Sequence, residues 1–348
     1  MRHRHKVCSI AAVGQYLLDH DIAPAEFLGS LGLPPAALLA GEFWLDRDQC
    51  LLLTNRLVLA TGDPLAGMHV AELQNVRNYG EWSDKFLAAR TLGGALQAAI
   101  ENTRLIETGR ELRLVPEGDR VRLRTSFAGA LGENPQQYLE ASLMVLSWYV
   151  RLAAEPVMLE VHIPGKKSRC SDEIERLFGP DIVFDADDAA LVFDRGALEL
   201  PIVGPDDSRL FNGRKRNLAT PAETAAAVVK WLDTPTECER PTAADVAQSL
   251  SLNLRTMQRH LAAWGVNFEE LLDDLRLRKA LIRLRDPGHS VTDVAFDLGY
   301  SDAAHFTRAF RRWTGGTPRQ YRDRSSAVAQ GMTLLLTSDG GMVSAQPK

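Results

Sequence analysis

GYSDAAHFTRAFRRWTGGTPRQYR, residues 299–322, is the stretch that decides the fold of the C-terminal part of this chain. It holds five arginines and one acidic residue, although the chain of 348 residues has a net charge of -5. Phe306, Phe310 and Trp313 follow one another at i, i+4 and i+7, which places them on one face of a helix. We expect that face to be buried and the arginines to lie off it.

The stretch is the second half of an internal repeat. TAADVAQSLSLNLRTMQRHLAAWG starts at Thr242, and SVTDVAFDLGYSDAAHFTRAFRRWTG starts at Ser290. Val246, Ala247 and Leu250 recur 48 residues later, and one inserted residue in the turn makes the offset 49 from there on. Each copy therefore predicts a short helix, a tight turn and a second helix, which is the helix-turn-helix layout.

Both copies begin with a signal for the start of a helix. Thr242 and Ser290 each stand three residues ahead of an aspartate, which resembles a capping box with Asp in place of Glu or Gln. Between the copies, residues 268–288 read FEELLDDLRLRKALIRLRDPG and predict a long amphipathic helix that ends at Asp-Pro-Gly. The repeat predicts an all-α domain in which this helix joins two helix-turn-helix units.

Charge is distributed unevenly along the chain. Residues 242–324 contain 13 Lys and Arg and 10 Asp and Glu, whereas the remainder contains 27 and 35. The C-terminal part is therefore mildly basic and the rest acidic. This fits a chain in which only one part meets a polyanion.

Residues 242–322 resemble the DNA-binding domain of the AraC/XylS family of bacterial transcription regulators. DVAFDLGYSD, HFTRAFRRWTG and the closing TPRQYR carry the resemblance, because their spacing satisfies the family's pattern throughout. The resemblance implies two recognition helices that enter adjacent major grooves of an operator, about 34 Å apart. It places these side chains at base edges: Arg255, Gln258 and Arg259 in the first helix, and Ala304, His305 and Arg308 in the second.

The chemistry of these side chains suits their implied roles. An arginine takes guanine O6 and N7 together and a glutamine pairs with adenine, whereas Ala304 offers only a methyl group, suited to thymine. Thr317 ahead of Pro318 predicts the start of a further helix, whose free N–H groups suit a phosphate. Trp264 and Trp313 are expected in the core. Contacts to the DNA backbone are assigned to Arg311, Arg312, Thr317, Arg319 and Arg322.

The first 210 residues or so predict an α+β domain. Residues 1–21 read as the first amphipathic helix, and further helices are expected around 27–31, 48–59 and 92–106. The period then changes to two, because residues 111–127, ELRLVPEGDRVRLRTSF, alternate apolar and charged residues on both sides of a turn and so predict a hairpin. The elements expected after it are a helix over 135–154, a strand at VMLEVHIP, a helix at SDEIERLFG and two strands around the acidic turn of IVFDADDAALVFD.

This N-terminal part is similar to the sensor domain of one subset of the same family, labelled arabinose-binding and found in regulators of the ornithine-responsive type. AARTLGGALQAAIEN, the hairpin and RLFGPDIVFDADDAALVFDRGALELPI carry the similarity. It implies a small effector, such as an amino acid or another small carbon source, that changes DNA affinity or polymerase contact. The candidate effector-binding residues are Tyr79, Trp82, Arg90, Trp148 and His162.

The expected organisation has four parts. They are an effector-sensing and dimerisation domain over 1–220, a helix and linker over 221–241, the double helix-turn-helix domain over 242–324 and a disordered tail over 325–348. A helix over 222–232 is placed where it helps a homodimer form. The implied partners are an operator in double-stranded DNA, a small-molecule effector and RNA polymerase, as for an activator, although the sequence does not distinguish activation from repression.

The sequence lacks the features that are typical of other classes of protein. Four single cysteines, without a CxxC or clustered histidines, argue against a disulfide framework, a zinc site and a DNA-repair methyltransferase. The chain has no Gly-rich phosphate loop, paired carboxylates or nucleophile motif, so neither an enzyme nor a cofactor is expected. No apolar stretch is long enough to span a bilayer, and a cytoplasmic protein is expected. The alternative is an architectural or constitutive DNA-binding protein whose N-terminal domain senses nothing.

Overall fold

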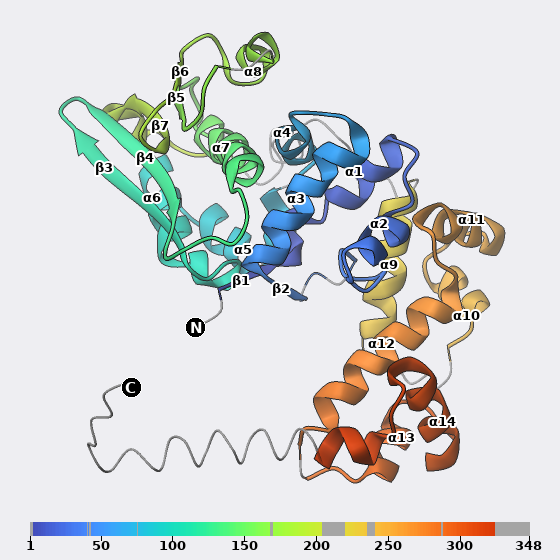
Figure 1. The fold of residues 1–348 in the computed structure, drawn as a ribbon. Coiled ribbons are helices and arrows are strands. Elements are labelled where there is room, and N and C mark those ends of the chain that lie inside the picture. Colours follow the sequence, from blue (N-terminus) through green and yellow to red (C-terminus); the bar gives the residue numbers. More distant parts are fainter. Residues whose placement is uncertain are drawn as a thin grey trace, which may run out of the picture. The chain divides into compact units, whose positions relative to one another are not determined.

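The computed structural model describes residues 3–39, 41, 43–74, 76–167, 170–203, 220–234, 241–286 and 288–323 (Figure 1). The chain divides into two compact units. Unit 1 comprises Met1–Ala227 and Arg255–Val266, and unit 2 comprises Val228–Leu254 and Asn267–Lys348. Residues 235–240 of the expected linker and the tail expected over 325–348 lie outside the described residues.

The N-terminus forms a strand. β1 (Arg4–Lys6) pairs antiparallel with β2 (Trp44–Asp46). The first α-helix, α1 (Val13–Asp19), starts only after the 3-10 turn η1 (Val7–Ile10). Within β1, His5 is buried between two more exposed neighbours, which is the period of a strand. The prediction of one helix over 1–21 is therefore wrong, because pairing with β2 takes up the first residues.

The helices that follow confirm the helical interpretation of residues 48–59 and 92–106. α3 ends where Gly62 takes a left-handed φ of 71°, a common helix terminator. α6 begins where Thr91 Oγ1 accepts a hydrogen bond from Gly94 N at 3.2 Å. The elements are α2 (Pro24–Ser30), α3 (Arg47–Thr61), α4 (Ala66–Glu72), η2 (Val76–Tyr79), α5 (Glu81–Leu87), α6 (Leu92–Glu101) and η3 (Thr103–Leu105).

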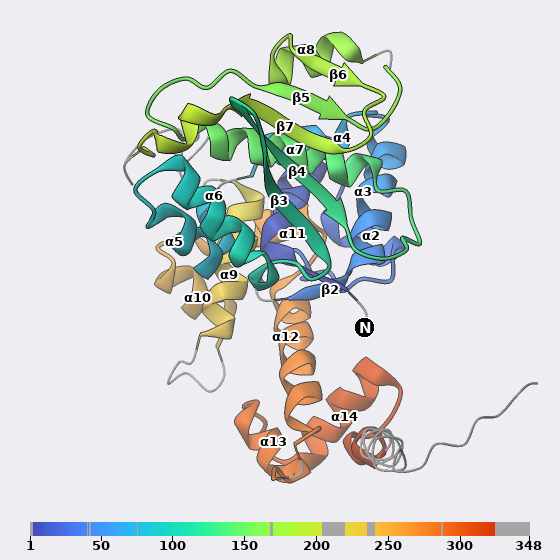
Figure 2. The same cartoon turned by 90° about the vertical axis from the view of Figure 1, so that its left-hand side faces the viewer.

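Unit 1 contains a five-stranded sheet in the order β3-β4-β7-β5-β6, which lies in front of the helices in Figure 2. The predicted hairpin is confirmed: Glu117 pairs with Arg120 across a two-residue turn, where Gly118 has a φ of +64°. Among the described strands, β5 and β6 form the only parallel pair. The strands are β3 (Arg110–Glu117), β4 (Arg120–Phe127), β5 (Glu160–Ile163), β6 (Ile182–Phe184) and β7 (Ala189–Asp194).

One long helix, α7 (Gln136–Arg151), packs along the sheet against β4 and β7 (Figure 2). Its apolar residues join those of α4, α5 and α6 in one core cluster of this unit. The acidic turn between β6 and β7 is held by an ion pair, because Arg122 donates to Asp188 Oδ1 at 3.2 Å. The remaining elements are α8 (Ser171–Phe178) and η4 (Arg195–Glu199).

Unit 2 is helical throughout its described part. Both predicted capping boxes form: Asp245 N donates to Thr242 Oγ1 at 3.2 Å, and Asp293 N donates to Ser290 Oγ at 3.1 Å. The helices are α10 (Ala243–Ser249), α12 (Phe268–Arg283), α13 (Val291–Asp297), α14 (Ala303–Thr314) and the C-terminal end of α9 (Pro221–Asp233).

The two turns of the repeat have the same backbone geometry. Ser251 and Gly299, 48 residues apart, both have a positive φ, of 54° and 80°. In both turns the third residue after the first helix donates a backbone hydrogen bond back into that helix, from Leu252 N at 2.8 Å and from Tyr300 N at 3.0 Å. The inserted residue therefore lies after this shared part of the turn, just ahead of α14.

Candidate functional site

α14 carries the second set of predicted base readers. Asp302 caps this helix by accepting a hydrogen bond from His305 N at 2.7 Å. Phe306 is fully buried in the core of unit 2. Ala304, His305 and Arg308 are exposed. The helix thus buries its aromatic face and leaves the predicted reading face open to solvent.

The arginines assigned to the DNA backbone have different surroundings. Arg312 is paired with Asp273 of α12 at 2.5 Å. Arg322 donates from Nε to the carbonyl of Leu284 at 3.3 Å and is partly buried. The other two, Arg311 and Arg319, are exposed.

Thr317 starts the last helical stretch, residues 318–323, as predicted from its sequence. Gln320 N donates to Thr317 Oγ1 at 3.2 Å, and Thr317 N donates to Gln320 Oε1 at 2.9 Å. Pro318 is buried at the first helical position. This reciprocal cap fixes the chain just after α14.

α11 (Leu254–Trp264) carries the first set, and from Arg255 on it belongs to unit 1. Arg255, Gln258 and Arg259 are exposed. The opposite face is buried, and His260 and Trp264 belong to it. The two predicted reading faces are therefore alike in exposure, but their helices belong to different units.

Trp264 fixes α11 to the N-terminal residues. The indole N–H donates to the carbonyl of Pro35 at 3.1 Å, and Trp264 is 1% exposed. Its ring covers Gly14 of α1 so closely that a Cβ at Gly14 would overlap it. One turn earlier, His260 Nδ1 lies 2.7 Å from Thr224 Oγ1 of α9. Burial, with a smaller effect of neighbouring Arg259, lowers the pKa of His260.

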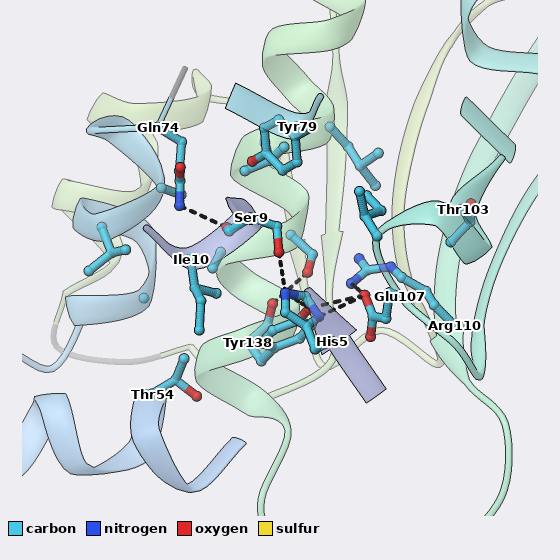
Figure 3. A pocket seen from close by; sticks show the side chains of 18 of the residues that line it. His5, Ser9, Ile10, Thr54, Gln74, Tyr79, Thr103, Glu107, Arg110 and Tyr138 are labelled. Carbon is cyan, nitrogen blue, oxygen red and sulfur yellow. Dashed lines mark hydrogen bonds and ion pairs between the residues drawn. The ribbon is translucent and has the colours of Figure 1, made fainter. Parts of the chain in front are cut away.

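Unit 1 also contains a partly open pocket of about 100 Å³, here called the Glu107 cavity (Figure 3). Residues from η1, α4, α5, β3 and α7 line it, and most of its wall is aliphatic or aromatic. The ionisable and polar side chains in the wall include His5, Ser9, Gln74, Glu107, Arg110 and Tyr138.

Three of these side chains meet at the carboxylate of a fourth, Glu107 (Figure 3). Glu107 Oε2 accepts hydrogen bonds from Tyr138 at 3.0 Å and Arg110 at 3.3 Å, and His5 Nδ1 lies 3.4 Å from it. Burial alone would raise the pKa of Glu107, but Arg110 and His5 outweigh it and hold this pKa at about 2. Burial alone would lower the pKa of Arg110, but the charge of Glu107 outweighs burial and raises this pKa. The pair is therefore ionised.

The cavity contains two of the five predicted effector-binding residues. Tyr79 and Trp82 line it, and the indole of Trp82 donates to the Ala99 carbonyl at 3.2 Å. The other three do not line the cavity. Arg90 is exposed, Trp148 packs on the core, and His162 on β5 is bonded to Glu160 and Arg122.

Sequence reasoning missed the polar group of the cavity. Glu107 and Arg110 stand three residues apart, with opposite charges, where the first strand of the hairpin begins. This pair of opposite charges at a short spacing is the local signal from which the buried ion pair could have been predicted. His5 had none, because it stood in a basic segment interpreted as a helix.

The described ranges contain no group of three or more His, Cys, Asp or Glu side chains placed to hold a metal ion. Among the same residues, no helix has the length and apolar character needed to cross a membrane.

Comparison with known proteins assigns both parts of the chain. Residues 22–202 match the family described as the arabinose-binding domain of AraC transcription regulator, N-term, and residues 246–324 match a helix-turn-helix domain family. The ornithine utilization regulator of Pseudomonas aeruginosa is 26% identical over 289 residues, 80% of this chain and 84% of that protein.

Other similarities are shorter or more distant. The HTH-type transcriptional activator RhaS of Salmonella arizonae is 41% identical over 86 residues, which are 24% of this chain and 31% of that protein. The crystal structure of the transcriptional regulator CdpR from Pseudomonas aeruginosa aligns with 86% of this chain and 96% of its own, at 23% identity and a TM-score of 0.39. Since the N-terminal family match alone spans more than half of the 348 residues, the chain belongs to the AraC family of transcription regulators, as a DNA-binding protein and not an enzyme.

Proposed function

We propose that this regulator reads two adjacent major grooves of an operator, with α11 in one and α14 in the next. The observation that carries the proposal is the matching exposure of the two helices. Each buries its apolar face and leaves its predicted base-reading side chains exposed. A major groove accepts one helix, and successive entries on one side of the duplex lie about 34 Å apart.

Base readout is assigned to the six residues expected from the sequence. Arg255, Arg259 and Arg308 suit guanine, and Gln258 suits adenine, at about 1–3 kcal/mol of discrimination for each bidentate pair. Ala304 reads at most a thymine methyl group, so α14 reads fewer bases than α11. His305, beside it, adds one polar contact.

Backbone contacts are assigned chiefly to Arg311 and Arg319, which are exposed. Arg312 must leave Asp273 before it meets a phosphate, and Arg322 is held by a carbonyl. Phosphate contacts position the protein and carry no sequence information directly. Arg312 and Arg322 therefore contribute mainly to the stability of the fold and less to DNA binding.

The Glu107 cavity is the proposed effector site. It lies in the N-terminal domain, it combines an apolar wall with a small group of polar side chains, and Tyr79 and Trp82 line it. Those are common properties of small-molecule sites. The effector is a small metabolite, such as an amino acid or another small carbon source, and the name of the Pseudomonas aeruginosa ornithine utilization regulator fits that class.

The effector signal has a short path to α11. Val13 of α1 lines the cavity, and the next residue, Gly14, lies against Trp264 of α11. Consecutive residues of a helix point about 100° apart. One helix therefore contacts the ligand site on one side and the first reading helix on another.

Selection of bound sequences from a random duplex pool, with the full chain, tests the reading proposal. Arg259→Ala and Arg308→Ala should each relax one base position of the selected site at a cost of about 1–3 kcal/mol. Arg311→Ala is the matched control and should weaken binding to all sequences and reduce the salt slope by about 1. If the first two variants lose affinity equally on every sequence, their arginines are phosphate clamps.

The sensing proposal is tested by thermal shift with panels of amino acids and carbon sources. Stabilisation by one class, with a change in operator affinity, supports it. Stabilisation by none favours the alternative, a constitutive or architectural DNA-binding protein.

The proposal has two further parts: the protein forms a homodimer with the help of α9, and it activates transcription through RNA polymerase. Sedimentation of the full chain and transcription from a selected operator test these two points.

A further inference from the structure

The buried face of α11 carries a polar residue that its counterpart in the repeat lacks. The buried residues of α11 are Met257, His260, Leu261 and Trp264. At the offset of 49, His260 corresponds to Ala309 of α14. Since α14 packs its core with an alanine at this position, the helix-turn-helix layout does not require a histidine there. The reason for His260 therefore lies in a contact outside the repeat.

That contact is with α9. His260 Nδ1 lies 2.7 Å from Thr224 Oγ1, and both side chains are buried. Burial lowers the pKa of His260, so the ring is neutral at about pH 7, and in either tautomer it shares one hydrogen bond with the hydroxyl. With the bond from the indole of Trp264 to the Pro35 carbonyl, α11 is held at two points one turn apart. Loss of either bond leaves a single point about which the helix can pivot.

The bond to Thr224 limits the rotation of α11 about its own axis. Apolar contacts have no preferred direction, whereas a hydrogen bond does. Side-chain tips lie about 5–6 Å from a helix axis, so a rotation of about 20° moves them by about 2 Å. That displacement breaks a bidentate contact between arginine and guanine, whose hydrogen bonds are about 2.7–3.2 Å long. Arg259 directly precedes His260, so the bond of one fixes the direction of the other.

We propose that Thr224 and His260 are positioning residues for base readout by α11, because their bond sets the rotation at which the three predicted base readers of this helix enter the groove. The proposal rests on the proposed reading role of α11. It gives α9 a part in sequence recognition, although no residue of α9 is among the predicted base readers.

Selection from a random duplex pool, with the full chain, tests the proposal. Thr224→Val removes the hydroxyl and keeps the shape of the side chain. The selected site should become degenerate at the position that Arg259→Ala also relaxes, and should keep the position that Arg308→Ala relaxes. Affinity for the wild-type site should fall about tenfold, as for the loss of one bidentate contact. Thr224→Ser keeps the hydroxyl and should restore both the selected sequence and the affinity.

Two further variants separate the bond from a general effect on the fold, and thermal unfolding checks that each is folded. Thr234→Val, just after α9, removes a hydroxyl that donates to the Lys230 carbonyl at 2.8 Å, and it should leave the selected site unchanged. His260→Ala gives α11 the residue that α14 has. It should relax the same position as Thr224→Val, and the double variant should lose little more affinity than either single one. Additive losses would mean that the two residues act separately and would overturn the proposal.

The same selections separate this inference from the proposed function. If Arg259→Ala relaxes no base position, α11 does not read bases, and the proposed readout and the positioning role both fail. If Arg259→Ala relaxes a position while folded Thr224→Val and His260→Ala proteins relax none, the readout stands and the positioning role is refuted. Equal loss of affinity on every sequence in these two variants would refute it as well.

Discussion

Gly14→Ala is the sharpest test of how α11 is held. Gly14 is in the first turn of α1, and an added Cβ would lie closer than 3.0 Å to two ring carbons of Trp264. Real Cβ atoms do not approach another atom so closely. The methyl group therefore has to displace the indole, which is 1% exposed and bonded to the Pro35 carbonyl.

The expected cost follows from two opposing effects. Overpacking a close contact costs about 1–3 kcal/mol, and replacing a helical glycine by alanine returns about 0.5–1 kcal/mol. The net loss is on the order of 1–2 kcal/mol in the free energy of unfolding, which for a unit of this size lowers Tm by roughly 2–8 °C. Gly29→Ala is the matched control, because Gly29 is exposed in α2 with nothing within 4 Å of the added Cβ. It should be neutral or slightly stabilising.

Urea and thermal unfolding of the two variants, with indole fluorescence, give the measurement. Gly14→Ala should unfold earlier than the wild type and Gly29→Ala no earlier. A Gly14→Ala protein that is as stable as Gly29→Ala, with an unchanged indole signal, would refute the packing of Trp264 on α1. It would also remove the path proposed between the cavity and the first reading helix.

Three further changes test separate contacts. Ser290→Ala removes the cap of α13 and should lower the free energy of unfolding by about 1 kcal/mol in urea; no change would mean that the helix end is satisfied elsewhere. Asp273→Ala frees Arg312 and should raise affinity for duplexes of any sequence, with less than about 1 kcal/mol of change in stability; unchanged affinity would place Arg312 away from DNA. Burial alone would lower the pKa of His69, but the hydrogen bond to Asp63 outweighs burial, and the pKa of His69 is raised in the folded protein. The contribution of His69 to stability is therefore complete below the pKa of the unfolded chain and is lost as pH rises through the pKa of the folded protein. The free energy of unfolding should therefore fall between roughly pH 6 and pH 8 in the wild type, and less so in His69→Gln; parallel pH profiles would contradict this.

The features that the sequence predicts well are the local ones. The repeat, its two capping boxes and the hairpin over residues 111–127 depend on neighbours a few residues apart, and all of them are present. The exposure of the predicted reading faces also follows, because the apolar stripe of each helix determines which side is buried. These elements need no information about distant parts of the chain.

The cavity and the position of α11 depend on long-range contacts and were not predicted. His5 and Tyr138 are 133 residues apart, and Trp264 and Pro35 are 229 apart. Neither spacing leaves a local pattern. His5 was misread for the same reason, since its burial depends on the pairing of β1 with β2, about 40 residues away.

The division of the repeat between two units has a consequence for regulation. The copies are alike in sequence, but α11 belongs to unit 1 and α14 to unit 2. Trp264 is packed against Gly14, whereas its counterpart Trp313 is only partly buried and packs against the core of unit 2 beside Phe310. The N-terminal domain therefore has direct contacts with α11, the first of the two predicted reading helices. Since the proposed binding at two grooves requires both helices at one fixed spacing, we propose that a ligand that moves α1 alters operator affinity without touching any predicted base-reading side chain.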